Sequence, residues 1–149
     1  QYAERGTDAF RLLPGRVIQL VFSRDAAPHT LPKRGRTLLS RAVARDFQPE
    51  INRRVGELNQ QFFRQKVGRV RLKYTHSRWG SCSAKGNINL STRLLFAPPD
   101  VIDYVIIHEL AHLIEPNHSH RFWTLVEQAM PDFREKEAWL KEHQAKCDF

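Results

Sequence analysis

The segment His108-Glu109-Leu110-Ala111-His112 combines side chains that can bind a metal ion and move a proton. Residues four apart lie on one face of a helix, so both imidazoles can reach one zinc ion at about 2.0–2.1 Å. Glu109 stands slightly aside, where its carboxylate can take a proton from a water that zinc has acidified. The pattern predicts one Zn²⁺ per chain and a hydrolase in which Glu109 activates a zinc-bound water.

Apolar residues surround this motif on nearly every helical face, which is typical of a buried helix. They are Val105, Ile106, Ile107, Leu110, Ala111, Leu113 and Ile114. Burying His and Glu side chains without partners is costly, whereas coordination of a metal would satisfy them. The alternative is a pair of core histidines satisfied by hydrogen bonds, and we favour the metal site over it.

A zinc hydrolase needs a third protein ligand and an open fourth position for water. His118 follows the helix-breaking segment Glu115-Pro116-Asn117, and a sharp turn there can bring its ring back over the metal. We therefore predict His118 as the third ligand. The competing candidates are His120 and three glutamates, Glu127, Glu135 and Glu137.

The segment Arg78-Trp79-Gly80-Ser81 is a candidate substrate-binding strand. If it forms a free sheet edge beside the metal helix, its backbone can bind an extended peptide by strand addition, and Gly80 permits close approach. The alternative is that Trp79 is core and Gly80 a bulge; for Trp79 we favour the core. The candidates for stabilising an oxyanion stay open, and they are His120, Tyr104, Tyr74 and Arg78.

The first half of the chain predicts a strand and then helices. Val17 to Phe22 is an apolar run typical of a strand, and the basic, proline-containing stretch from Pro28 to Arg36 predicts a loop. Apolar residues recur at helical spacing from Thr37 to Phe63. Pro49 interrupts that spacing, which predicts two helices or one kinked helix.

The second half predicts a small sheet followed by helices. Residues 70–74 alternate with period two, and residues 79–83 and 87–91 flank the turn Ala84-Lys85-Gly86. Proline punctuation then predicts helices from Pro98 to Pro116, from a Ser119 cap to about Met130, and from Phe133 to Lys146. We expect an α+β fold with a short mixed sheet.

With 149 residues, 41% hydrophobic and 27% charged, the chain has the composition of one globular domain. We expect a single domain over 1–149, divided into a basic strand and helix part, 1–69, and a catalytic core, 70–149. The sequence has no apolar run of membrane-spanning length and no secretory pattern at its start. Cys82 and Cys147 form no metal-type pair, which favours reduced thiols and a cytoplasmic protein without a membrane partner.

The net charge of +8 is unevenly distributed. Residues 1–80 hold 17 Lys and Arg against 6 Asp and Glu, whereas residues 81–149 hold 7 against 10. The basic half can contact nucleic acid, although a solvated surface explains scattered arginines equally well.

Beyond the zinc motif, several segments closely resemble the YgjP-like metallopeptidase family. They are Ser77-Arg78-Trp79-Gly80-Ser81-Cys82-Ser83, Gly86-Asn87-Ile88-Asn89-Leu90, residues 103–113, Asn117-His118-Ser119 with Phe122-Trp123, and Pro131-Asp132-Phe133 with Trp139-Leu140. The resemblance is continuous from about Ser77 to Leu140 and is weak upstream of Val70.

This resemblance implies a small zincin fold related to the SprT-like proteases, with zinc on His108, His112 and His118 and with Glu109 catalytic. The expected function is hydrolysis of peptide bonds in a polypeptide substrate. The alternatives are a nucleic-acid-associated zinc module with a structural or weakly active metal site, and a protease recruited to nucleic acid. A zinc hydrolase acting on a non-peptide amide is a further alternative.

Overall fold

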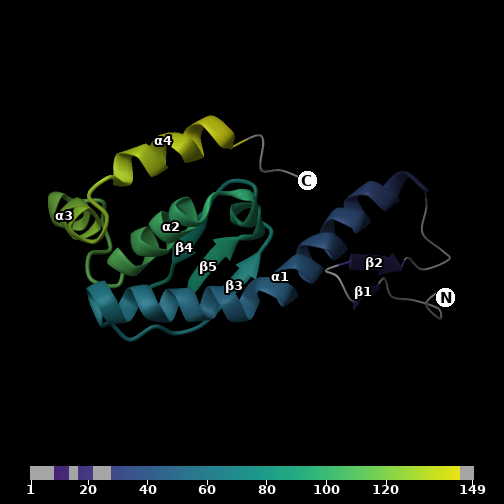
Figure 1. The fold of residues 1–149 in the computed structure, drawn as a ribbon, viewed down its shortest axis with the longest axis horizontal. Coiled ribbons are helices and arrows are strands. Elements are labelled where there is room, and N and C mark those ends of the chain that lie inside the picture. Colours follow the sequence, from purple (N-terminus) through teal and green to yellow (C-terminus); the bar gives the residue numbers. More distant parts are fainter. Residues whose placement is uncertain (1–8, 14–16, 22–27, 145–149) are drawn as a thin grey trace. The chain divides into compact units, whose positions relative to one another are not determined.

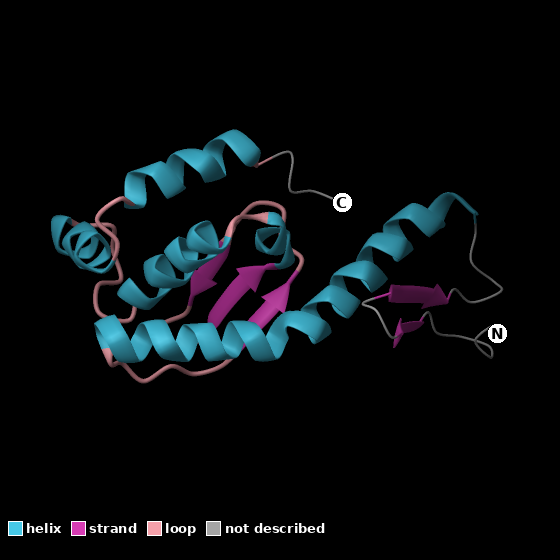
Figure 2. Ribbon diagram, viewed as in Figure 1, coloured by secondary structure: helices cyan, strands magenta, loops and turns pink. Residues whose placement is uncertain are grey.

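The computed structural model describes residues 9–13, 17–21 and 28–144, and these form four α-helices, five strands and shorter helical turns (Figure 1). The chain divides into two compact units, residues 1–47 and residues 48–149. Helices precede and follow a small mixed sheet, as Figure 2 shows, which confirms the predicted α+β class.

In the first unit, β1 (Ala9–Leu13) pairs antiparallel with β2 (Val17–Val21). β2 confirms the strand predicted from Val17, and the last predicted residue, Phe22, lies outside the described residues. The sequence did not predict β1, because its five residues Ala-Phe-Arg-Leu-Leu lack the alternation of a half-buried strand.

The predicted loop from Pro28 to Arg36 is wrong. A short 3-10 turn, η1 (Pro28–Thr30), leads directly into helix α1 (Leu31–Leu58). Pro32 is the second residue of α1, and a proline in the first turn loses no intrahelical hydrogen bond.

Helix α1 runs through Pro49 as one helix and ends in the π-helical turn η2 (Asn59–Phe63). The amide of Gln48, next to this proline, bonds to the edge strand β3 (Val70–Lys73). Gln48 Nε2 donates to the Val70 carbonyl at 3.1 Å, and its Oε1 accepts from the Leu72 N–H at 3.0 Å. The side chain therefore satisfies backbone groups that an edge strand leaves free.

The second sheet has the order β3-β5-β4, with β5 (Ile88–Ser91) in the middle. β3 is parallel to β5, and β4 (Gly80–Cys82) is antiparallel to it. The Gly86 N–H bonds to the Ser83 carbonyl at 2.9 Å, and Gly86 has a φ of +80°, which confirms the predicted hairpin. Among the described residues β4 has one strand neighbour, so its outer edge has no strand partner.

After the turn η3 (Thr92–Phe96), three helices follow. α2 (Pro99–Ala111) begins at the predicted prolines. It ends before the predicted stop at Pro116, with His112 as its C-cap. α3 (His120–Ala129) begins at the predicted cap, where the Ser119 hydroxyl accepts from the Phe122 N–H at 3.4 Å. α4 (Phe133–His143) covers the last predicted helix, whose end at Lys146 lies outside the described residues.

Helix α2 is the centre of the second unit. It contacts β4 and β5 on one side and α3 and α4 on the other (Figure 1), and eight of its thirteen residues are buried. A bidentate ion pair fixes it to α1: Arg54 Nε and Nη2 lie 2.7 and 2.6 Å from the two carboxylate oxygens of Asp103. The apolar pattern around the zinc motif therefore corresponds to the most enclosed helix of this unit.

No helix among the described residues combines the length and the hydropathy that a bilayer span requires.

Candidate metal centre

Three imidazole rings converge at the C-terminal end of α2. His108 and His112 lie one turn apart on this helix, and His118 reaches them from the loop before α3. His118 Nε2 is 3.1 Å from His108 Nε2 and 3.2 Å from His112 Nε2. In a tetrahedral site with Zn–N bonds of about 2.0–2.1 Å, ligand nitrogens lie about 3.3–3.4 Å apart. The donor set and its spacing therefore fit a zinc ion.

A backbone carbonyl fixes the tautomer of His112. Its Nδ1 lies 3.1 Å from the Glu115 carbonyl oxygen, which can only accept, so Nδ1 carries the proton. Nε2 then carries the lone pair, and it is this atom that faces His118. Such a bond to the far ring nitrogen is the usual way in which proteins orient a histidine ligand.

Burial keeps two of these rings uncharged. It lowers the pKa of His108 to about 4, with smaller contributions from the neighbouring His112 and His118. Burial also lowers the pKa of His112, although its bond to the Glu115 carbonyl opposes the shift. Since a metal binds neutral imidazole, both rings are in the ligand form at neutral pH.

Aromatic side chains hold the rings in place. Phe122, which is fully buried, stacks on His112 with ring centroids 4.4 Å apart and an interplanar angle of 27°. Trp123 stacks on His118 at 5.9 Å, also at 27°. Both residues lie near the start of α3, a few positions after His118, so the chain order already brings them close to the third ring.

Glu109 is buried at 6% exposure and lies beside the histidine cluster. Burial raises the pKa of its carboxyl to about 7, and the charge of Arg78 partly opposes this shift. A carboxylate with a pKa near neutral can accept a proton from water and later return it.

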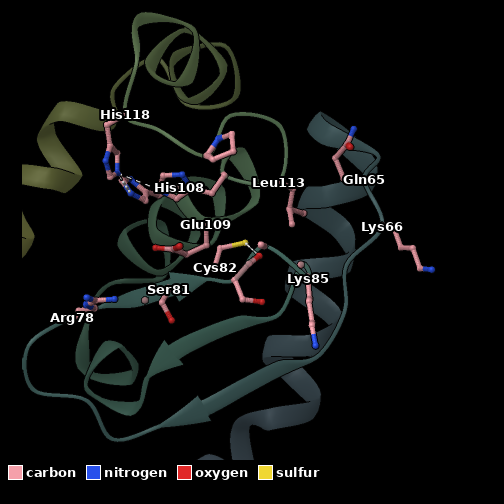
Figure 3. A pocket seen from close by; sticks show the side chains of 16 residues that line it. Gln65, Lys66, Arg78, Ser81, Cys82, Lys85, His108, Glu109, Leu113 and His118 are labelled. Carbon is pink, nitrogen blue, oxygen red and sulfur yellow. Dashed lines mark hydrogen bonds between the residues drawn. The ribbon is translucent and has the colours of Figure 1, made fainter.

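Gly80 of β4 lies directly against Glu109. A Cβ at this position would be 3.1 Å from Glu109 Cγ and 3.2 Å from its Oε1. Figure 3 shows Glu109 on α2 facing Ser81 and Cys82 of the same strand. Because Gly80 has no side chain, the Glu109 carboxylate has room beside β4.

The remaining residues of the predicted substrate strand have different surroundings. Arg78 is exposed at one end of the cleft, and Ser81 is half-buried on β4. Trp79 is half-buried, with its ring 4.6 Å from the Arg93 guanidinium carbon. Trp79 is therefore partly covered, but it also borders a cavity beside the cleft.

A cleft of about 770 Å³ opens over the histidines. Its walls come from residues 65–66, from Arg78, from β4 with its following turn at residues 80–86, and from the end of α2 (Figure 3). His108, Glu109, His112 and His118 all line it, so an extended polypeptide can reach the cluster.

The competing third ligands lie elsewhere. Within the described part of the chain, His108, His112 and His118 are the only group of three potential ligands. His120 and Glu127 line a cavity that none of the three histidines borders, and Glu135 lies 3.9 Å from Lys136. Glu137 lines that cavity and also the one that His108 and Glu109 border, but it does not belong to the group of three potential ligands.

The oxyanion candidates are also separated. Arg78 lines the cleft, whereas Tyr104 lines the cavity beside it. His120 borders a further cavity with Trp123, and Tyr74 directly follows β3. Of the four, Arg78 is the one whose charge acts on Glu109 from the cleft side.

Cys82 lines the cleft as well. Burial raises the pKa of its thiol, and the neighbouring Glu109 raises it further. A thiol of this kind is a poor nucleophile at neutral pH.

The chain matches a known protein family. The family described as YgjP-like, metallopeptidase domain, matches residues 16–143. The similarity therefore extends well upstream of Val70, where the sequence motifs showed only a weak resemblance to this family. No curated protein is similar enough in sequence to count as a match.

Two solved structures share the fold. The metallopeptidase zymogen abylysin of Pyrococcus abyssi is 26% identical, with a TM-score of 0.57 over 63% of this chain and 95% of its own. The metallopeptidase zymogen jannalysin of Methanocaldococcus jannaschii is 19% identical, with a TM-score of 0.54 over 62% of this chain and 94% of its own.

Proposed function

The chain belongs to the YgjP-like metallopeptidase family and is a peptidase by that membership, and from this premise we propose that it uses one zinc ion held by His108, His112 and His118. The observation that carries the proposal is the convergence of three imidazole nitrogens beside one buried carboxylate. When bound, zinc would polarise the scissile carbonyl and acidify the attacking water.

Glu109 is the proton carrier of this proposal. Its carboxylate takes a proton from the attacking water and passes it to the nitrogen of the leaving amine. The buried position and the pKa of about 7 support this role, because the group can exist in both protonation states near neutral pH. Arg78 is the group that we propose to stabilise negative charge on the substrate in the cleft.

The outer edge of β4 is the proposed docking strand for the substrate. Its backbone groups on that side have no strand partner among the described residues, and the cleft runs along it. Strand addition uses backbone hydrogen bonds, so it holds the peptide extended and brings one carbonyl to the cluster.

We also propose that both compact units form one metallopeptidase domain, because the family match at residues 16–143 crosses the division at residue 47.

One comparison tests the proposed chemistry. Zinc content by elemental analysis and cleavage of casein are measured for the parent chain and for Glu109→Gln. We expect one zinc per chain in both, with cleavage lost only in the variant. Equal cleavage by the variant, or a parent chain that binds no zinc after purification without chelators, refutes the proposal.

The basic first half supports a second proposal, recruitment to nucleic acid. Arg41 and Arg45 lie one turn apart and are exposed on α1. Binding of this kind weakens steeply as salt rises, because counterions are released from phosphates. A chain that binds neither DNA nor RNA at low salt contradicts it.

A further inference from the structure

The cleft over the histidines has basic walls. Its lining includes three cationic side chains, Lys66, Arg78 and Lys85, and all three are exposed. Among the described residues that line the cleft, the one acidic side chain is Glu109, which is 6% exposed and is assigned to proton transfer. The solvent-facing walls therefore carry a positive charge that no other lining side chain compensates.

The surrounding sequence strengthens this positive field. From Leu58 to Pro99 the sequence has eight Lys and Arg residues and no Asp or Glu. This acid-free stretch contains β3, β4 and β5, and it supplies ten of the sixteen residues that line the cleft. A cleft lined by one sign of charge concentrates ligands of the opposite sign.

The loop that carries Lys66 is held in place by the fold. The Asn59 side chain bonds to both backbone groups of Gln65: its Nδ2 donates to the carbonyl at 2.7 Å, and its Oδ1 accepts from the N–H at 3.0 Å. Arg64 has a φ of +52°, a left-handed conformation that costs energy in a residue other than glycine. The surrounding bonds hold this backbone in its costly form, so the position of Lys66 is set by the fold.

Lys85 lies at the same end of the cleft as Lys66. The Gly68 N–H donates to the Gly86 carbonyl at 2.8 Å, which joins the loop after η2 to the hairpin turn after β4. Each lysine is within two residues of this junction. Figure 3 shows both lysines at one end of the cleft and Arg78 at the other. We call the part with Lys66 and Lys85 the lysine end.

Resting on the proposed peptidase function, we propose that the lysine end binds an acidic stretch of the polypeptide substrate, so that the enzyme prefers Asp or Glu a few residues from the cleaved bond. A peptide along the outer edge of β4 passes from the histidines towards Lys85, because the hairpin turn directly follows this strand. Alternate side chains of an extended peptide share one face, and each ammonium group has three donors on a flexible stem that can meet a carboxylate.

Nucleic acid is the competing ligand for a basic surface, and the cleft favours a peptide over it. Among the described residues that line the cleft there is no Phe, Tyr or Trp on which an unpaired base could stack. The outer edge of β4 instead offers backbone hydrogen-bonding groups, which match an extended polypeptide.

Binding of a probe tests the lysine end without hydrolysis. The zinc-loaded full chain with Glu109→Gln is titrated with a labelled glutamate-rich peptide, and with the same peptide carrying Gln in place of each Glu, by fluorescence anisotropy. We expect the acidic peptide to bind about tenfold more tightly at low salt, and this advantage to decrease as salt rises, because exposed charges are screened. Equal affinities for the two peptides overturn the proposal.

A matched pair of double variants locates the binding. Lys66→Gln with Lys85→Gln removes the lysine end, whereas Arg71→Gln with Lys73→Gln removes the same charge from exposed residues of β3 that do not line the cleft. Affinity for the acidic peptide should fall about five- to tenfold in the first variant and less than about twofold in the second. Equal losses would mean that only net charge matters, which contradicts the assignment.

Two further titrations complete this test. Replacing both lysines by Arg keeps the charge, so the preference for the acidic peptide should remain. A single-stranded oligonucleotide that binds more tightly than the acidic peptide, and loses affinity when Lys66 and Lys85 become Gln, would assign the lysine end to nucleic acid and overturn the proposal.

Cleavage-site mapping then links the lysine end to catalysis. A peptide library of random sequence is digested by the zinc-loaded parent chain, and the cleaved bonds are identified by mass spectrometry. Asp and Glu should be enriched about three- to tenfold on one side of the cleaved bond, and the enrichment should disappear when Lys66 and Lys85 become Gln. Cleavage without this enrichment overturns the proposal. Absence of all cleavage refutes the peptidase function, and the titrations then decide separately whether the lysine end binds acidic peptides.

Discussion

Replacing Glu109 by Gln should stabilise the metal-free protein at pH 8 while it removes activity. Burial raises the pKa of this carboxyl from 4.5 to about 7, so the folded protein holds the ionised form at a cost. A carboxyl whose pKa is higher in the folded than in the unfolded protein stabilises the fold at pH values below its unfolded-state pKa. This stabilisation is lost as the pH rises through the folded-state pKa of about 7. Glutamine has nearly the same shape but no charge, so the variant does not lose this stability at high pH.

The magnitude follows from the shift. Raising the pKa of the Glu109 carboxyl from 4.5 to about 7 corresponds to about 3 kcal/mol. The expected gain for Glu109→Gln is therefore about 2–3 kcal/mol at pH 8, or about 5–10 °C in melting temperature. At pH 5, where the folded carboxyl is protonated, the gain should fall below about 1 kcal/mol.

Urea unfolding of chelator-treated protein at pH 8 and pH 5 measures this difference. Glu127→Gln is the control, because Glu127 is exposed on α3 and its replacement should have no pH-dependent effect. A gain of equal size at both pH values would mean that packing and not charge is responsible. Destabilisation at pH 8 would refute the argument that Glu109 is held ionised at a cost.

Three further predictions concern the metal centre. Gly80→Ala puts a Cβ 3.1 Å from Glu109 Cγ, so kcat should fall about 10- to 100-fold while zinc content stays at one per chain; loss of zinc would contradict this. Phe122→Ala removes the ring stacked on His112, and unfolding titrations should show a loss of about 3–5 kcal/mol, with zinc affinity at least about tenfold lower. In metal-free protein, NMR should show His108 neutral at pH 5.5 with a midpoint near 4, and because its folded pKa is lowered, stability should decline as the pH falls from 6.5 towards 4. A midpoint near 6.5 would show that the ring is not desolvated.

The sequence determined the features that depend on neighbours within one helical turn or one hairpin. The spacing of His108 and His112 is a property of any helix, and the prolines and glycine at the element ends restrict backbone dihedrals locally. The α+β class, the hairpin at Gly86 and the starts of α2 and α3 were predicted for this reason. The helical start at Leu31 was not, because a proline in a first turn and a proline in a loop look alike in sequence.

Tertiary structure alone decided which distant segments meet. The meeting of His118 with the α2 histidines depends on how the chain turns after Pro116, which spacing permits but does not require. The contact of Gly80 with Glu109 joins residues 29 positions apart, and the bond of Arg93 to the Gln144 carbonyl joins residues 51 positions apart. Such contacts arise when whole elements pack, since packing energy depends on complementary surfaces and not on sequence separation. The cavity beside the cleft belongs to this second group, because its walls come from β4, α2 and α4, which no local pattern connects.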